Sequence, residues 1–261
     1  MTENIRKIIE DMAEKDYKEF SSALIPGCEN MLGVRLPELK KLAKQLVKEN
    51  SAWRELLAGE DIYFEEVMLR GYIIGFGTAK EDDFEKAVKE FWNFVPLVDN
   101  WSVNDSFCGS FSIVDRYRDE FIPHIQKLIY SKDEFEARIG LIMLLDHYLK
   151  VDADGKKKVR LRKVDMEDIS SESGGDGKYI DRIIELTNRD FGENGYYTQM
   201  AAGWLLAEAF VVFPGKIWDF LSDKDNLKHD DISYHKAIRK ICESKTPSDE
   251  VKQEIKKLLQ L

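Results

Sequence analysis

Apolar residues recur along most of this chain at the spacing of amphipathic helices. In residues 3–14, for example, Ile5, Ile8, Ile9 and Met12 form a stripe with a period of about 3.6 residues. Pro37 falls where the first turn of a helix tolerates proline. The same reasoning predicts further helices at 37–46, 53–57, 62–76, 84–94, 99–113, 122–130, 135–149, 180–186, 196–213, 217–221, 229–242 and 249–259. No stretch alternates cleanly with a period of two, so the pattern predicts no β-sheet.

The breaks between these segments are short, and helix pairs recur at a spacing of roughly forty residues. This rhythm favours an all-α fold, an α-solenoid of stacked antiparallel helix pairs in which each pair contacts its neighbours. Sequence identity between the pairs is poor, so a general helical bundle is the alternative. We interpret residues 1–261 as a single domain.

One segment departs from the helical pattern. Residues 151–178 are polar, glycine-rich and mixed in charge, which predicts a surface insertion. Val159, Leu161 and Val164 hint at a short hairpin within it. Its basic residues are Lys156, Lys157, Lys158, Arg160, Arg162 and Lys163. They either contact a polyanion or are solvated.

The composition places the chain among globular proteins, with 43% hydrophobic and 34% charged residues. The sequence contains no run of about 18 apolar residues, so it predicts no transmembrane helix. The first residues lack the apolar core of a signal peptide. We therefore expect a cytoplasmic protein with no membrane partner. The 3 cysteines and 4 histidines show neither disulfide nor zinc spacing. We therefore expect no metal and no cofactor.

Three glycines, Gly71, Gly75 and Gly77, lie close together within one predicted helix. No strand precedes them and no Gly-Lys-Ser/Thr follows, so they do not form a phosphate-binding loop. We expect these glycines to allow close packing of two helices.

The formal net charge of −10 argues against nucleic acid as a partner, because DNA affinity depends on Lys and Arg that neutralise phosphates. A basic stripe can nevertheless line one face of an acidic protein. Two clusters have helical spacing: Lys40, Lys41, Lys44 and Lys48 in one, and Lys236, Arg239 and Lys240 in the other. The alternative interpretation of each is a solvated helix face.

The most informative pair is Trp101 and Asp105, four residues apart in a predicted helix. Residues at i and i+4 share a helix face. An aromatic ring beside a carboxylate can hold a cationic centre, such as the oxocarbenium-like transition state of glycosidic bond cleavage. The alternative is a core tryptophan next to a capping or salt-bridged aspartate.

Several motifs resemble those of one known family. They are LGVRLPELKKLAK at 32–44, MLRGYIIGF at 68–76, VDNWSVNDSFC at 98–108, EFEAR at 134–138, YYTQMAAGW at 196–204 and YHKAIRKIC at 234–242. In this order they resemble the DNA alkylation repair family of HEAT-like-repeat proteins, the AlkD-like DNA glycosylases. The resemblance implies an α-solenoid whose concave face holds double-stranded DNA with alkylated bases.

The resemblance also implies an activity. Such enzymes hydrolyse the N-glycosidic bond of cationic alkylated purines, such as 3-methyladenine and 7-methylguanine, without flipping the base into a pocket. An Asp, two Trp and an Arg form their site. By motif these match Asp105, Trp101, Trp204 and Arg138, all of which are present. The basic positions expected to bind DNA are Lys41, Lys44, Arg138, Lys236, Arg239 and Lys240.

In this interpretation Asp105 stabilises the positive charge on the sugar and orients the attacking water, while the two tryptophans contact the lesion's deoxyribose and backbone. Arg138 clamps a phosphate. Alternatively, Arg138 pairs with Glu134, four residues earlier, and Trp204 packs against Met200 and Ala201. We expect a monomer. The competing functions are a non-catalytic helical-repeat module that binds DNA or protein, and an enzyme that uses Asp105 as a base on another substrate.

Overall fold

The computed structural model describes residues 1–157, 163–170 and 177–259, and this part of the chain is all-helical, as predicted. No β-strand occurs in these ranges, where extended backbone pairs only at isolated bridges such as Val164 with Pro247. The chain divides into two compact units, Met1–Tyr117 and Arg118–Leu261. The single-domain organisation stays a prediction.

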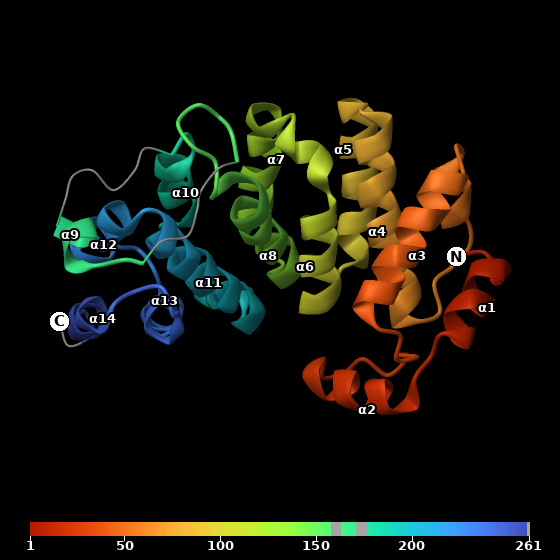
Figure 1. Cartoon of the computed structure of the whole chain (residues 1–261), viewed down its shortest axis with the longest axis horizontal. Coiled ribbons are helices and arrows are strands. Elements are labelled where there is room, and N and C mark those ends of the chain that lie inside the picture. The colour runs from red at the N-terminus through yellow and green to blue at the C-terminus, as the bar shows by residue number, and fades with distance from the viewer. Residues whose placement is uncertain (158–162, 171–176, 260–261) are drawn as a thin grey trace. The chain divides into compact units, whose positions relative to one another are not determined.

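The first unit is built around one long buried helix, α4 (Phe64–Glu81), which packs against α3 (Leu36–Glu49), α5 (Phe84–Phe94) and α6 (Trp101–Ser110) (Figure 1). The other elements of this unit are α1 (Glu3–Asp11), α2 (Lys15–Leu24) and the 3₁₀ turns Trp53–Leu57, Val95–Leu97 and Ser112–Asp115. Helix α4 buries residues on most of its circumference. Its apolar residues are therefore nearly continuous along the sequence and do not recur at the spacing of a single helix face.

The glycines of α4 let its neighbours approach closely, as the sequence predicted. A Cβ added to Gly75 would lie 2.7 Å from the backbone oxygen of Ser110, and one on Gly71 would lie 2.9 Å from the Phe94 ring. Both distances are too short for real contacts, so any side chain here would push α6 or α5 away. The glycines therefore set the position of α6, the helix that carries Trp101 and Asp105.

Two buried glutamates at the start of α4 hold the surrounding loops. The Glu65 carboxylate accepts hydrogen bonds from the backbone amides of residues 32, 33 and 34, at 2.9, 2.7 and 3.1 Å. Glu66 accepts from the amides of residues 62 and 63 and from Arg6 Nε. Hydrogen bonds of this kind are needed because a buried carboxylate without them would be strongly destabilising. Glu65 thereby fixes the loop that leads into α3.

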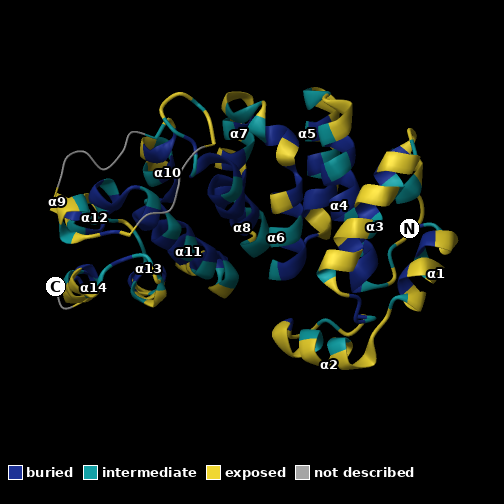
Figure 2. Ribbon diagram, in the orientation of Figure 1, coloured by how far each residue is buried: buried dark blue, intermediate teal, exposed yellow. Residues whose placement is uncertain are grey.

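The second unit is organised around α11 (Tyr196–Val212), which packs against α8 (Glu134–Met143), α12 (Pro214–Ser222) and α13 (Asp231–Glu243). Figure 2 shows α11 as largely buried. The remaining elements are α7 (Arg118–Ile129), α9 (Met166–Ser170), α10 (Ile180–Thr187), α14 (Asp249–Lys257), the 3₁₀ turn Gly192–Asn194 and a π-helical turn, Leu144–Tyr148, that follows α8.

Two helices escaped the sequence-based prediction. Helix α2 has no buried residue and leaves Phe20 and Leu24 exposed, as Figure 2 shows by its yellow and teal ribbon. Helix α9 lies inside the segment 151–178, which was interpreted as a polar surface insertion and for which no helix was predicted.

The described ends of the segment 151–178 are anchored in the core of the second unit. Val151, Val164 and Ile169 are buried, and the Val164 amide donates to Thr246 O at 3.1 Å. Of the hairpin predicted at Val159, Leu161 and Val164, the first two residues lie outside the described residues, as do Lys158, Arg160 and Arg162 of the basic cluster. No helix of the described chain is long and apolar enough to cross a membrane.

Candidate active-site residues and nucleic-acid interface

Trp101 and Asp105 lie on successive turns of α6, and both are half-buried. Asn100 caps this helix, because its side-chain oxygen accepts from the amides of Ser102 and Val103 at 3.0 Å each. The helix therefore begins at Trp101, which puts the indole in the first turn and the carboxylate one turn later. The predicted i,i+4 relation is confirmed.

Trp101 also supports α2. Its indole Nε1 donates to Leu24 O, at the end of α2, over 3.1 Å. Together with Phe20, Leu24 and Phe64 it lines an apolar hollow of about 130 Å³. Part of the indole is thus committed to packing, which is the alternative use that the sequence analysis left open. Only the remaining surface of the ring can contact a ligand.

On the neighbouring helices, two lysines lie over aromatic rings. Lys40 Nζ is 6.0 Å from the Tyr72 ring centroid, and Lys44 Nζ is 5.4 Å from that of Phe76. The two rings are parallel, with centroids 6.1 Å apart, because they are one turn apart on α4. Burial raises the pKa of Tyr72, against the smaller opposing effect of a hydrogen bond with Ser106. This row is suited to a polyanion, because it combines lysine charge with aromatic surface.

Lys41 and Lys44, the residues predicted to bind DNA in this unit, differ in their surroundings. Lys44 is exposed and lies over Phe76, whereas Lys41 is exposed and 4.0 Å from the Glu38 carboxylate. An exposed pair at that distance contributes little to stability. Lys41 is therefore free to exchange Glu38 for a phosphate.

In the second unit, Arg138 is only 5% exposed and donates from Nη1 to Tyr197 O at 2.7 Å. The Glu134 carboxylate accepts from the Tyr197 amide at 2.6 Å. The two side chains thus hold both sides of one residue in the first turn of α11. A phosphate contact by Arg138 must be made through the small part of its side chain that remains exposed.

Trp204 is half-buried on α11, one turn after Met200 and two turns after Tyr196. These three residues share a helix face because they are spaced by four. Helices α8 and α11 pack against each other, so Arg138 and Trp204 come from neighbouring helices of the same unit. The sequence could not show this, since 66 positions separate them.

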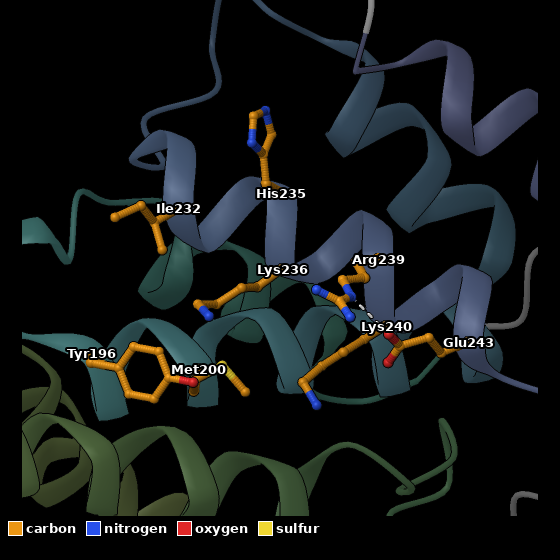
Figure 3. A pocket seen from close by; sticks show the side chains of 8 residues that line it. All are labelled: Tyr196, Met200, Ile232, His235, Lys236, Arg239, Lys240 and Glu243. Atoms are coloured by element: carbon orange, nitrogen blue, oxygen red, sulfur yellow. Dashed lines mark hydrogen bonds and ion pairs between the residues drawn. The ribbon is translucent and has the colours of Figure 1, made fainter.

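A pocket of about 500 Å³ lies between α11 and α13 (Figure 3). Its lining consists of Tyr196, Met200, Ile232, His235, Lys236, Arg239, Lys240 and Glu243. The structure thus brings the three predicted DNA-binding residues of α13 to one site. Tyr196, which is 58% exposed, was not among the residues predicted to bind DNA. Its place two turns before Trp204 was the available signal.

Two features fix the positions of α11 and α13, which form the pocket walls. A Cβ on Gly203 would lie 2.7 Å from Lys236 Cβ and 3.0 Å from Ala237 N, so glycine allows α13 to approach α11. Asp230 caps α13 by accepting from the Ser233 amide at 2.9 Å, and it also accepts from Gln199 Nε2 of α11 at 2.8 Å.

Asp230 is partly buried, and burial alone would raise the pKa of its carboxyl. Hydrogen bonds from Ser233, from the Phe191 amide and from Gln199 outweigh this effect and hold the pKa below its usual value.

No group of three or more His, Cys, Asp or Glu side chains in the described part of the chain is placed to hold a metal ion. The candidate functional groups are instead a half-buried carboxylate, Asp105, one turn from the indole of Trp101, and lysines over aromatic rings. Side chains of these kinds have the chemistry to contact an anionic polymer and to stabilise a cation. A model of the DNA alkylation repair enzyme family matches residues 5–241, and the chain therefore belongs to this family. No curated protein matches the sequence.

Membership in this family confirms the resemblance and implies DNA repair, with DNA as the partner.

Proposed function

We propose that the protein is a DNA glycosylase that hydrolyses the N-glycosidic bond of cationic alkylated purines, such as 3-methyladenine and 7-methylguanine. In this proposal its helices form an α-solenoid, and it acts as a cytoplasmic monomer on double-stranded DNA without flipping the lesion into a pocket. The observation that carries the proposal is the placement of Trp101 and Asp105 on adjacent turns of a capped helix, both half-buried, in a member of a DNA alkylation repair family.

The chemistry asks little of the protein. Alkylation at N3 or N7 already gives the base a positive charge, so it leaves without a strong general acid. Cleavage of the glycosidic bond gives the sugar oxocarbenium-like positive charge, which a nearby carboxylate stabilises. Asp105 takes this role and also orients the attacking water. Trp101 and Trp204 contact the lesion's sugar and backbone, and Arg138 contacts a phosphate.

The test is base release from methylated duplex DNA by the wild-type protein and by Asp105→Asn. Removing one electrostatic stabiliser from a site of this kind costs about 10²–10³ in rate. We therefore expect Asp105→Asn to lose release by that factor while its affinity for DNA stays close to wild type. Asp99→Asn is the matched control, because Asp99 is an exposed carboxylate just before the same helix. Equal release by the wild type and Asp105→Asn would refute the mechanism.

A second function is favoured by two contacts. The Trp101 indole donates to Leu24 O, and the buried Arg138 donates to Tyr197 O. Both residues therefore have structural uses, as they would in a helical-repeat module that binds DNA without chemistry. Wild-type protein that binds duplex DNA in a salt-dependent manner, yet releases no base above the spontaneous rate, would establish this second function instead.

A further inference from the structure

Large apolar side chains are exposed at the pocket between α11 and α13. Tyr196 is 58% exposed and Ile232 is 51% exposed, and Met200 lies on the α11 wall beside Tyr196 (Figure 3). Large apolar side chains grouped in a pocket with a few polar groups are typical of ligand sites. A volume of about 500 Å³ exceeds what a bare phosphate needs and falls in the range for small-molecule sites.

Two of the three cations that line this pocket have no carboxylate partner in the described part of the chain. Arg239 is paired with Glu243 at 2.8 Å, the one carboxylate of the lining. Within residues 1–157, 163–170 and 177–259, no carboxylate lies in ion-pair range of Lys236 or Lys240. In a chain with 49 acidic and 39 basic residues, two lysines without a carboxylate on one wall make a local site for an anion.

Lys236 Nζ lies 4.4 Å from the centroid of the Tyr196 ring. A contact of this kind at an exposed site is weak. The ammonium can therefore leave the ring for a phosphate at little cost. Its departure uncovers an aromatic face on which a nucleobase can stack.

The backbone next to Tyr196 is also held in place in advance. Glu134 and Arg138 bind the amide and the carbonyl of Tyr197, the next residue, at 2.6 and 2.7 Å. These contacts fix the first turn of α11, so the backbone that carries Tyr196 loses little entropy on binding.

We propose that this pocket binds one unpaired nucleotide of a DNA strand, with the base stacked on Tyr196 and the adjoining phosphate held by Lys236 and Lys240. A paired duplex can occupy the lysines but not the ring, because its bases are stacked on each other. The nucleotide in question is not the alkylated one. The inference deepens the proposed function by resting on DNA as its partner, and it is independent of base hydrolysis.

The experiment measures binding to two undamaged duplexes that contain 2-aminopurine, a fluorescent base whose emission reports stacking. In one duplex it forms a single-nucleotide bulge, and in the other it is fully paired. Wild-type protein is expected to bind the bulged duplex about tenfold more tightly, because stacking on an aromatic side chain is worth about 1–3 kcal/mol per base. Binding should also change the emission of the bulged base.

The variants separate the ring from the charges. Tyr196→Phe should keep the preference, whereas Tyr196→Leu should remove it and the emission change. Lys236→Gln and Lys240→Gln should weaken binding to both duplexes, each lowering the salt dependence by about one phosphate contact. Tyr130→Leu is the matched control, because Tyr130 is also 58% exposed with a cation, Arg189, over its ring, but lies outside the pocket.

Equal affinity of the wild type for the two duplexes would overturn the proposal, and so would an unchanged preference in Tyr196→Leu. Because Tyr196 is exposed, these variants should fold, and thermal melts check that they do. Base release by the same samples reports on the glycosylase separately: an inactive protein that prefers the bulge refutes the proposed function alone, and an active protein without the preference refutes only this inference.

Discussion

The His229 side chain offers a test of the structure at the base of α13. Its ring lies near those of Phe191 and Phe220, with centroids 6.2 and 5.8 Å away. Both ring nitrogens are buried and have no hydrogen-bond partner among the described residues. Burial lowers the pKa of His229 from 6.5 to about 4, against the weaker opposing effect of Asp230 and Asp190. We expect this histidine to make folding sensitive to mild acid.

The sign and size follow from proton linkage. Below pH 6.5 the unfolded chain binds a proton at this position, whereas the folded protein does not bind it until about pH 4. The contribution of neutral His229 is therefore complete above pH 6.5 and is lost as the pH falls toward 4. One proton corresponds to about 1.4 kcal/mol per pH unit, which gives about 3 kcal/mol over this interval.

The assay compares wild type with His229→Leu in urea unfolding curves between about pH 7 and about pH 4.5. The variant should lack the acid-dependent loss, so the difference between the two curves should grow by about 1.4 kcal/mol per pH unit below 6.5. At neutral pH the variant should be at least as stable as wild type, because two buried nitrogens without partners are removed.

His235→Gln serves as the control, because it removes an exposed histidine from the neighbouring helix α13 and should leave the slope unchanged. Parallel curves for wild type and His229→Leu at all pH values would refute the reasoning, since they would mean that His229 reaches water or a partner in the folded protein.

Three further predictions concern the interface. Gly203→Ala should lower the free energy of unfolding by about 1–2 kcal/mol, because the clash with Lys236 outweighs the gain in helix propensity, and an unchanged urea midpoint would contradict it. Asp230→Ala should lower the free energy of unfolding by about 2 kcal/mol near neutral pH. Because the pKa of Asp230 is lowered in the folded protein, this deficit should persist as the pH falls to the usual carboxyl pKa and vanish as the pH falls through the folded pKa, which urea unfolding at a series of pH values checks. Affinity for duplex DNA should fall steeply with salt concentration and Lys44→Gln should reduce the slope by about one, whereas a flat response in a binding titration would count against phosphate contacts.

Local periodicity was enough to predict most helices, because a helix that buries one face must repeat apolar residues every three or four positions. The predicted segment 84–94 matches α5 and 180–186 nearly matches α10. Helix α2 escaped this reasoning because it buries no residue. The end of α8 shows another limit, since its apolar pattern continues through a π-helical turn that the pattern does not distinguish.

Some features of the candidate site could likewise be predicted from the sequence, and others could not. The sequence by itself determined that Trp101 and Asp105 share a face and that Lys236, Arg239 and Lys240 lie on one helix, because these relations depend only on helical spacing.

Only the tertiary structure decided that Arg138 is buried against Tyr197 and that Tyr196 faces the lysines of α13. The physical reason is that both outcomes depend on which helices pack together and on how closely a glycine such as Gly203 lets them approach.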